Sequence, residues 1–437
     1  MSEKDVAKEG VRRVDRNKSR KNSSRRSQKR RGISKWLKSP YFWFALAAVF
    51  ALAAAAGFLV MKSRDGSASA SENTATVAET TSDTQTATVP AATATEQLVA
   101  AMPLEEKIGQ MMMVGFEGLE PSAEIISAIQ EKHIGAVILF GRNIDSHEQV
   151  ANTNAALQAH AAQVNQPVKL MIAVDQEGGA TRRFTDIGPY YSEPMIGEMG
   201  GDAAPAAAQQ QASSAARDLK KLGFNTNLAP VVDVSDGWGS IMDVRSYGTD
   251  AELVAELGGM AVRGYNNATT ISCPKHFPGH GSADGDSEDG LPTVDLSLEV
   301  FEQSEFPPFQ KVIEEGAPMI MVAHLVVPAL DATGTPASLS RPIVFDLLRT
   351  KLAFPGVIIS DDLEMGAITE NMGVGAAAVA AVAAGNDMII VAHTTTNQLE
   401  AYEALLAAVK SGQLKEVDIN KSVTRIIDMK KKYRLEK

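Results

Sequence analysis

The stretch Lys275–Glu288, which reads KHFPGHGSADGDSE, concentrates residues able to do chemistry within a chain of 437 residues. Its 14 positions hold one lysine, two of the chain's seven histidines and three acidic residues, with three glycines and Pro278 among them. Helices and strands tolerate such a glycine and proline content poorly, so we expect a loop. The apolar segment Ala268–Cys273 just before it predicts a buried strand. The polar cluster is therefore expected at the carboxyl end of a strand, where α/β proteins place their chemistry.

Several classes of chemistry are disfavoured because the chain lacks their motifs. There is no Walker loop and no Rossmann glycine pattern. Cys273 is the only cysteine and is predicted within a strand, which disfavours cysteine catalysis and excludes an intramolecular disulfide. A metal site is a weaker interpretation, and its four potential ligands are His276, His280, Asp286 and Asp361. Because the two histidines lie on a Pro-Gly loop and not on a helical HExxH motif, we expect no metal, and no organic cofactor is needed.

Acidic residues are the remaining feature. Two carboxyl groups, one ionised as a nucleophile and one placed to donate a proton, are the equipment for cleaving a glycosidic bond. Side chains that would donate or accept hydrogen bonds to sugar hydroxyls are also present, namely Asp175, Arg183, Arg245 and Lys275.

Eight short apolar runs would position these residues. They are Gln110–Val114, Ala136–Phe140, Val168–Val174, Thr226–Val232, Ala268–Cys273, Pro318–Val322, Val357–Ile359 and Met388–Val391. Helical patterns such as Ala203–Leu222 and Gln398–Val409 accompany them. Runs that are continuously apolar indicate strands buried on both faces, so we predict a (β/α)8 barrel, with a doubly wound sheet as the alternative.

Ionisable residues follow six of the eight runs, as a barrel with its active site at the strand ends requires. They are Asp175, Asp233, Lys275 with His276, His324, Asp361 with Asp362, and His393. Any one of them alone is more simply explained as a cap or a loop residue, but six of eight strand ends favour a site.

Five segments resemble glycoside hydrolase family 3, in its bacterial β-N-acetylglucosaminidase branch. They are DQEGGATRRF (175–184), APVVDV (229–234), DVRSYG (243–248), KHFPGHG (275–281) and SDDLEM (360–365). The resemblance implies that Asp361 is the covalent nucleophile. It also implies that five residues hold the non-reducing N-acetylglucosamine unit: Asp175, Arg183, Arg245, Lys275 and His276.

One departure from the family pattern concerns the proton donor. The resembling branch carries an Asp-Ser-His loop, in which the histidine is the acid/base and the aspartate tunes it. Here the loop reads Asp286-Ser287-Glu288. A partly desolvated carboxyl beside Asp286 can have a raised pKa and donate a proton, so we predict that Glu288 is the acid/base. An altered reaction preference and a sugar-binding protein with little turnover stay open as alternatives, as does a β-glucosidase-like specificity.

The N-terminal part of the chain predicts a membrane anchor. Met1–Pro40 holds 15 Lys and Arg residues against 4 acids, although the whole chain has a net charge of −11. Its basic run RRSQKRR favours nucleic acid in isolation, but the uncharged segment Tyr41–Met61 that follows has about the 20 apolar residues of a bilayer-spanning helix. The basic tail then places the N-terminus in the cytoplasm. A cleavable signal peptide is the alternative, and the unusual length of both segments disfavours it.

Four parts are therefore expected: a cytoplasmic tail (1–40), an anchor (41–61), a Ser/Thr/Ala-rich flexible linker (62–95) and a catalytic barrel (96–437). The barrel would lie outside the membrane, within reach of peptidoglycan fragments that end in N-acetylglucosamine. A monomer that binds no nucleic acid is expected.

Overall fold

The structure is a computed structural model, and it describes residues 92–164, 166–237 and 239–436. The predicted tail, the predicted anchor and most of the predicted linker lie outside these residues. Within the described ranges, no helix combines the length and the apolar character that crossing a bilayer requires. Helix α3 (Ala94–Ala101) begins inside the range predicted as linker, because Thr93 and Glu96 form a capping box.

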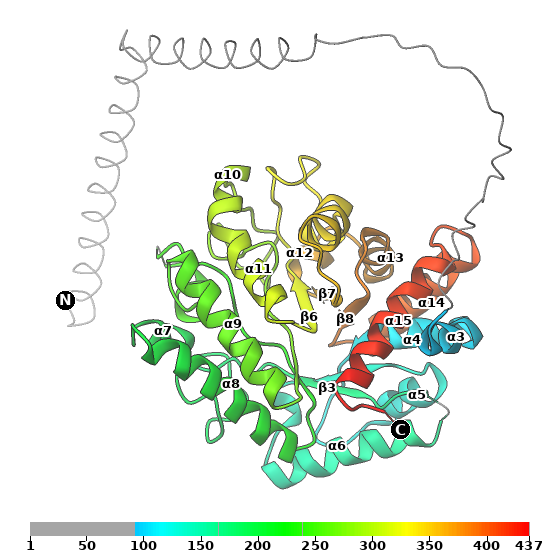
Figure 1. Ribbon diagram of the computed structural model, residues 1–437. Coiled ribbons are helices and arrows are strands. Elements are labelled where there is room, and N and C mark those ends of the chain that lie inside the picture. The colour runs from blue at the N-terminus through cyan, green and yellow to red at the C-terminus, as the bar shows by residue number, and fades with distance from the viewer. Residues whose placement is uncertain (1–91, 165, 238, 437) are drawn as a thin grey trace, which may run out of the picture. The chain divides into compact units, whose positions relative to one another are not determined.

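Eight parallel strands form the centre of the described domain, and they confirm the predicted α/β architecture (Figure 1). They are β1 (Met112–Val114), β2 (Ala136–Leu139), β3 (Met171–Val174), β4 (Thr226–Asn227), β5 (Ile271–Ser272), β6 (Met319–Val322), β7 (Val357–Asp362) and β8 (Met388–Val391). Each lies within one predicted run, except that β7 continues to Asp362. Cys273 follows β5 directly and is buried, so its prediction as a strand residue was wrong by one position.

The hydrogen-bonded order β5-β4-β3-β2-β1-β8-β7-β6 is that of a near-closed barrel and excludes the doubly wound alternative. Between β5 and β6 the wall is completed by the polar segment itself. Phe277 N–H donates to the Met321 carbonyl at 2.8 Å, and Ala323 N–H donates to the Phe277 carbonyl at 2.8 Å. On the other side, Val232 N–H donates to the Lys275 carbonyl at 2.8 Å. Residues 275–277 are therefore part of the barrel wall, and the prediction that they form a loop was wrong.

Helices alternate with the strands and surround them (Figure 1). Those of eight or more residues are α3, α5 (Ala123–Glu131), α6 (His147–Ala162), α8 (Ala203–Lys221), α9 (Ala251–Asn267), α11 (Phe306–Glu314), α13 (Val374–Ala384), α14 (Thr395–Lys410) and α15 (Glu416–Lys432). Shorter ones are α4 (Leu104–Gln110), α7 (Glu193–Gly197), α10 (Leu298–Val300) and α12 (Gly366–Thr369). The chain also forms 3-10 turns η1 (Gly141–Asn143), η2 (Ile241–Val244) and η4 (Ala337–Leu339), and π-helical segments η3 (Phe301–Glu305) and η5 (Pro342–Lys351).

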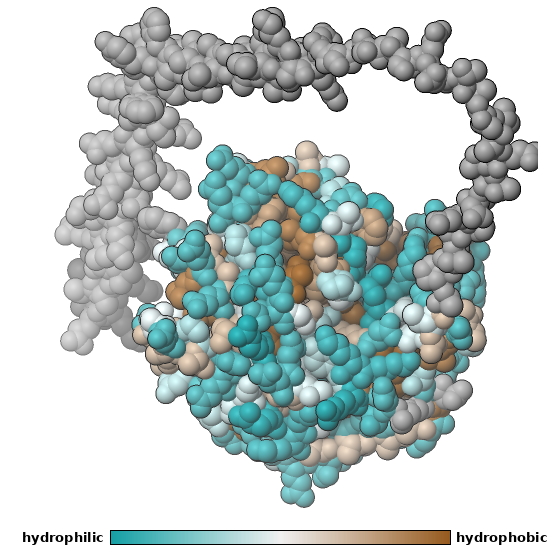
Figure 2. Space-filling model, viewed as in Figure 1, coloured by the Kyte–Doolittle hydropathy of each residue, from teal (hydrophilic) through white to brown (hydrophobic). Residues whose placement is uncertain are grey.

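Burial explains why the strands read as continuous apolar runs. Every residue of β1, β2, β3, β6 and β8 is buried, because helices cover the outer face of the barrel and side chains fill its interior. Hydrophilic residues predominate on the outer surface of α8, α9 and α11 (Figure 2). This division of apolar and polar faces fixes the register of the strands, and the register aligns their polar ends.

Candidate active site

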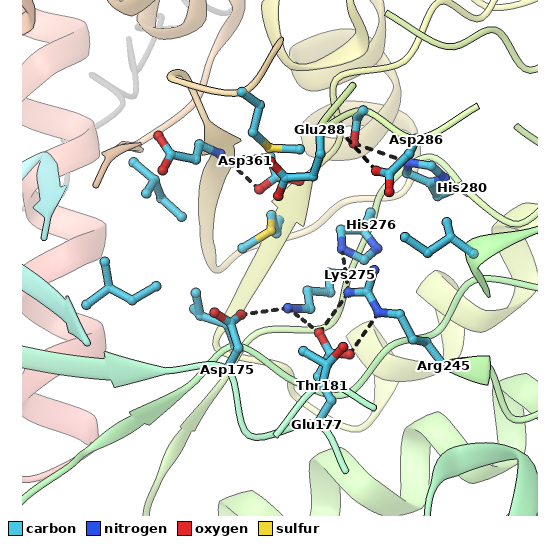
Figure 3. Close-up of a pocket in the computed structure, with 18 of the residues that line it drawn as sticks. Asp175, Glu177, Thr181, Arg245, Lys275, His276, His280, Asp286, Glu288 and Asp361 are labelled. Atoms are coloured by element: carbon cyan, nitrogen blue, oxygen red, sulfur yellow. Dashed lines mark hydrogen bonds and ion pairs between the residues drawn. The ribbon is translucent and has the colours of Figure 1, made fainter. Parts of the chain in front are cut away.

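The polar residues at the strand ends line one pocket of about 300 Å³ (Figure 3). All eight predicted site residues line it: Asp175, Arg183, Arg245, Lys275, His276, Asp286, Glu288 and Asp361. A volume of this size is at the lower end for small-molecule sites and suits a single sugar ring.

The loop after β3 returns Arg183 to the strand end that carries Asp175. The Gln176 side chain holds this loop, since its Oε1 accepts the backbone N–H groups of Arg183 at 2.8 Å and Phe184 at 3.1 Å. Arg183 Nη2 consequently lies 3.3 Å from Asp175 Oδ2. Arg183 Nε is buried and has no hydrogen-bond partner among the described residues. A hydroxyl or carbonyl oxygen of a bound sugar would satisfy such a donor.

Glu177 was not among the predicted site residues, yet it holds two of them in place. It is only 3% exposed, and its Oε1 lies 2.7 Å from Lys275 Nζ and 2.8 Å from Arg245 Nη2. Burial opposes ionisation of Glu177, but the charges of Lys275 and Arg245 outweigh it and lower its pKa. Lys275 Nζ is also 2.9 Å from Asp175 Oδ1, so four charged side chains form one cluster. A signal was available, because residues two apart in an extended chain share a face.

Asp233 orients His276. Its Oδ2 lies 2.7 Å from His276 Nδ1, and its Oδ1 accepts the backbone N–H groups of His276 at 3.1 Å and His280 at 2.7 Å. Burial opposes ionisation of Asp233, but the neighbouring His276 ring and its hydrogen bond outweigh burial and lower the Asp233 pKa. With Nδ1 facing a carboxylate, His276 Nε2 is left to accept, and it lies 3.4 Å from Arg245 Nη2. The sequence placed Asp233 at a strand end without a role, and the structure makes it a positioning residue.

Asp361 lies near the end of β7 and is the predicted nucleophile. Its Oδ1 accepts the backbone N–H of Asp362 at 2.9 Å. Burial favours the neutral carboxyl, but the nearby His276 and His324 rings, this backbone amide and Lys275 outweigh burial. The pKa of Asp361 therefore lies below its ordinary value, and the carboxylate is ionised at neutral pH, as a nucleophile must be.

Asp362, the other member of the pair, is held by protein partners. Its Oδ1 accepts the backbone N–H of Glu364 at 3.0 Å, and its Oδ2 lies 3.2 Å from His393 Nε2. Its carbonyl faces His324 Nε2 at 2.9 Å. His324 and His393, which follow the sixth and eighth strands, thus support the end of β7. Oδ1 of Asp362 is therefore hydrogen-bonded to the backbone, whereas Oδ2 has only the ion-pair contact with His393. The lowered pKa of Asp361 is what favours Asp361 as the nucleophile.

Glu288 lies on the exposed loop after β5, and its carboxyl is turned toward Asp361 (Figure 3). Asp286 Oδ1 accepts the backbone N–H of Glu288 at 3.1 Å, which fixes the turn that presents the side chain. Partial burial raises the pKa of Glu288, and the charges of Asp361, Asp286 and Asp362 raise it further. Asp361 and Glu288 therefore have pKa shifts of opposite sign, as a nucleophile and a proton donor require.

No three His, Cys, Asp or Glu side chains within the described ranges are arranged to hold a metal ion. His280, one of the potential ligands, instead places its Nε2 3.3 Å from Ser287 Oγ. The pocket therefore offers two carboxyl groups beside a ring of hydrogen-bonding side chains, an arrangement able to cleave a glycosidic bond.

Comparisons with known proteins agree with this chemistry. Residues 103–429 match the family model described as the glycosyl hydrolase family 3 N-terminal domain. The chain is similar to β-hexosaminidase A of Pseudoalteromonas piscicida, with 31% identity over 78% of this chain and 63% of that protein. It is similar to the β-hexosaminidase of Xanthomonas oryzae pv. oryzae, with 33% identity over 65% of this chain and 84% of that protein.

Solved structures give the same picture. A family 3 β-N-acetylglucosaminidase from Paenibacillus sp. str. FPU-7 is similar, with a TM-score of 0.74 and 40% identity over 77% of this chain and 63% of that chain. The β-N-acetylhexosaminidase of Beutenbergia cavernae has a TM-score of 0.69 and 28% identity, over 76% of this chain and 99% of that one. The chain thus spans less than two thirds of the Pseudoalteromonas and Paenibacillus proteins and most of the other two.

Proposed function

The chain belongs to glycosyl hydrolase family 3, and from this premise we propose that it is a membrane-anchored, retaining β-N-acetylhexosaminidase. Its substrates are peptidoglycan fragments that end in N-acetylglucosamine. The observation that carries this proposal is the pair Asp361 and Glu288, two carboxyl groups with opposed pKa shifts that face one sugar-sized pocket. The relatives named as β-hexosaminidases support the choice of sugar.

The reaction proceeds in two displacements at the anomeric carbon. Asp361 attacks this carbon and forms a glycosyl ester, while Glu288 gives its proton to the departing oxygen. Glu288, now a carboxylate, then takes a proton from water, and the water oxygen displaces Asp361. Two inversions leave the β configuration unchanged.

The charged cluster positions the sugar for both steps. Asp175 and Lys275 lie at one side of the pocket, and His276 lies nearer Glu288 (Figure 3). Arg183 and Arg245 also line the pocket. These groups contact hydroxyl and acetamido oxygens and transfer no proton. Their contribution is orientation, which lowers the barrier because the reacting atoms are already aligned.

Hydrolysis of nitrophenyl β-N-acetylglucosaminide by the purified domain tests this proposal. Turnover of that substrate, together with slow or undetectable turnover of the matching glucoside, is the expected result. A preference for the glucoside would instead support a β-glucosidase-like specificity. The glutamate that stands where the resembling branch has histidine also motivates a second candidate, a wall-binding protein with little turnover. Binding of N-acetylglucosamine without hydrolysis of either glycoside would favour it.

The location of the domain is a separate part of the proposal. The charge step from the basic residues 1–40 to the acidic remainder, across the uncharged segment 41–61, supports a cytoplasmic N-terminus. Protease added to intact spheroplasts should remove the catalytic domain and leave the basic tail attached to the membrane. A periplasmic or external marker protein serves as the positive control. A catalytic domain that resists the protease until detergent is added would contradict this orientation.

A further inference from the structure

The loop that carries Glu288 rests on the elbow between β7 and α12. The Ser287 carbonyl accepts the backbone N–H of Ala367 at 3.2 Å. Ala367 is the second residue of α12, so its N–H has no acceptor within that helix. The same elbow carries Asp361 a few residues earlier, at the end of β7. One short segment therefore connects the two groups that react with the substrate.

Gly366 makes this contact close. A Cβ placed on Gly366 would lie 2.6 Å from the Glu288 carbonyl oxygen and 3.4 Å from the Asp289 carbonyl carbon. Real Cβ atoms essentially never approach a backbone oxygen within 3.0 Å. A backbone segment, unlike the end of a flexible side chain, cannot shift at low cost in free energy. Gly366 begins a helix and has no positive φ, so the backbone conformation does not require glycine there. Position 366 therefore requires glycine because the Glu288 backbone occupies the space that a side chain would need.

Other attachments of the loop lead to other parts of the barrel. Val294 N–H donates to the Val326 carbonyl and Val326 N–H donates to the Pro292 carbonyl, each at 2.9 Å, in the segment that follows β6. Ser287 is buried and its Oγ lies 3.3 Å from His280 Nε2, while Glu288 itself is exposed apart from the face that it turns to the pocket. Asp286 bonds within the loop, where its side chain accepts the Glu288 N–H and its carbonyl accepts the Asp289 N–H. The main-chain contact with residues 366 and 367 is thus the one that ties the Glu288 backbone to the strand of Asp361.

We propose that Gly366 is a positioning residue, which sets the distance between Glu288 and Asp361 by letting the Glu288 backbone lie directly against the β7–α12 elbow. This inference rests on the proposed function, because it assigns Glu288 the proton transfer. It predicts that one added methyl group at position 366 displaces the proton donor and leaves the nucleophile and the sugar-binding cluster in place.

Gly366→Ala tests the proposal through the leaving group. A displacement of about 1 Å should lower kcat/KM for an unactivated disaccharide about 100-fold. A dinitrophenyl N-acetylglucosaminide departs without protonation, so its kcat/KM should stay near the wild-type value. Gly290→Ala is the matched control, because it adds the same methyl group two residues after Glu288, where the nearest atom, Glu370 Oε2, is 4.0 Å away. It should behave like the wild type on both substrates.

Two further readouts separate positioning from a general structural effect. In a Glu288→Gln background, Gly366→Ala should change kcat/KM by no more than about twofold, since its effect passes through the missing carboxyl. The basic limb of the kcat/KM profile should also move to lower pH in Gly366→Ala, because Glu288 is then less buried and farther from the Asp361 charge. Equal losses on both substrates, or equal losses in both backgrounds, would overturn the proposal.

Amide hydrogen exchange in the wild-type protein gives a test that needs no substitution and no turnover. The Ala367 N–H should exchange slowly while the loop is in place, because it donates to the Ser287 carbonyl, its one acceptor among the residues that the structure describes. Exchange as fast as that of an open loop would show that the elbow does not hold the Glu288 loop. If the wild type hydrolyses no N-acetylglucosaminide at all, the proposed function fails, and this measurement still decides whether the contact exists.

Discussion

Replacing Asp361 by Asn should lower kcat by a factor on the order of 1,000 or more and leave the fold intact. An amide cannot form the glycosyl ester, and removing the charge also removes an anion that stabilises the positive charge developing on the sugar. The change is nearly isosteric, and the amide oxygen can still accept the Asp362 N–H. Steady-state kinetics on a nitrophenyl β-N-acetylglucosaminide measure the loss, and thermal unfolding checks that the barrel is unchanged.

Trapping the intermediate identifies the attacking residue directly. A 5-fluoro N-acetylglucosaminyl fluoride should label the wild-type protein. The ring fluorine slows both displacements, but the good fluoride leaving group keeps formation of the ester faster than its hydrolysis, so the ester accumulates. Peptide mapping should place the label on Asp361, and Asp361→Asn should take up none. A label on Asp362 would mean that its partners Glu364 and His393 release it during the reaction.

Replacing Glu288 by Gln should produce a loss that depends on the leaving group. The kcat/KM for an unactivated disaccharide should fall by about 100-fold or more, because its alkoxide departs only with a proton. The kcat/KM for a dinitrophenyl glycoside should change little. Its kcat should still fall, since the second displacement needs a base to activate water. Asp289→Asn, which alters the neighbouring exposed acid, is the matched control and should leave both substrates unaffected.

Azide and pH complete this test. Added azide should restore kcat of Glu288→Gln on the dinitrophenyl substrate and yield the β-glycosyl azide, because an anion needs no general base.

In the wild type, kcat/KM requires protonated Glu288 and ionised Asp361. The raised Glu288 pKa therefore moves the basic limb upward, and the lowered Asp361 pKa moves the acidic limb downward. Glu288 is not the acid/base if Glu288→Gln matches the wild type in three respects: the kinetic constants for every substrate, the basic limb of the pH profile and the response to azide.

The barrel could be predicted from the sequence because its strands are buried on both faces. That burial turns each strand into a continuous apolar run, so all eight could be located, and β4 and β5 were merely shorter than their runs. The site followed from the same logic. Parallel strands end at one face of a barrel, so Asp175, Lys275 and Asp361, far apart in the chain, had to converge.

What escaped prediction depends on contacts between distant backbone segments. The participation of residues 275–277 in the barrel wall arises from hydrogen bonds to β6, which no local pattern encodes. Glu177 and Asp233 lie in segments that the resemblance identified, but their roles depend on contacts with Lys275 and His276, which are far away in the sequence. The contact of Gly366 with Glu288 likewise joins the start of a helix to a loop, and neither sequence predicts the other as its neighbour.

The two carboxylates proposed to react, Asp361 and Glu288, are attached to the barrel in different ways, and this difference has an evolutionary consequence. Asp361 is part of β7, where any change of length or register would disturb neighbouring strands. Glu288 is exposed on a loop, and its own side chain supports nothing else in the fold. The proposed proton donor can therefore be exchanged with less disturbance of the fold than the proposed nucleophile. A glutamate at the place where the resembling branch has histidine is the kind of exchange that such an attachment permits.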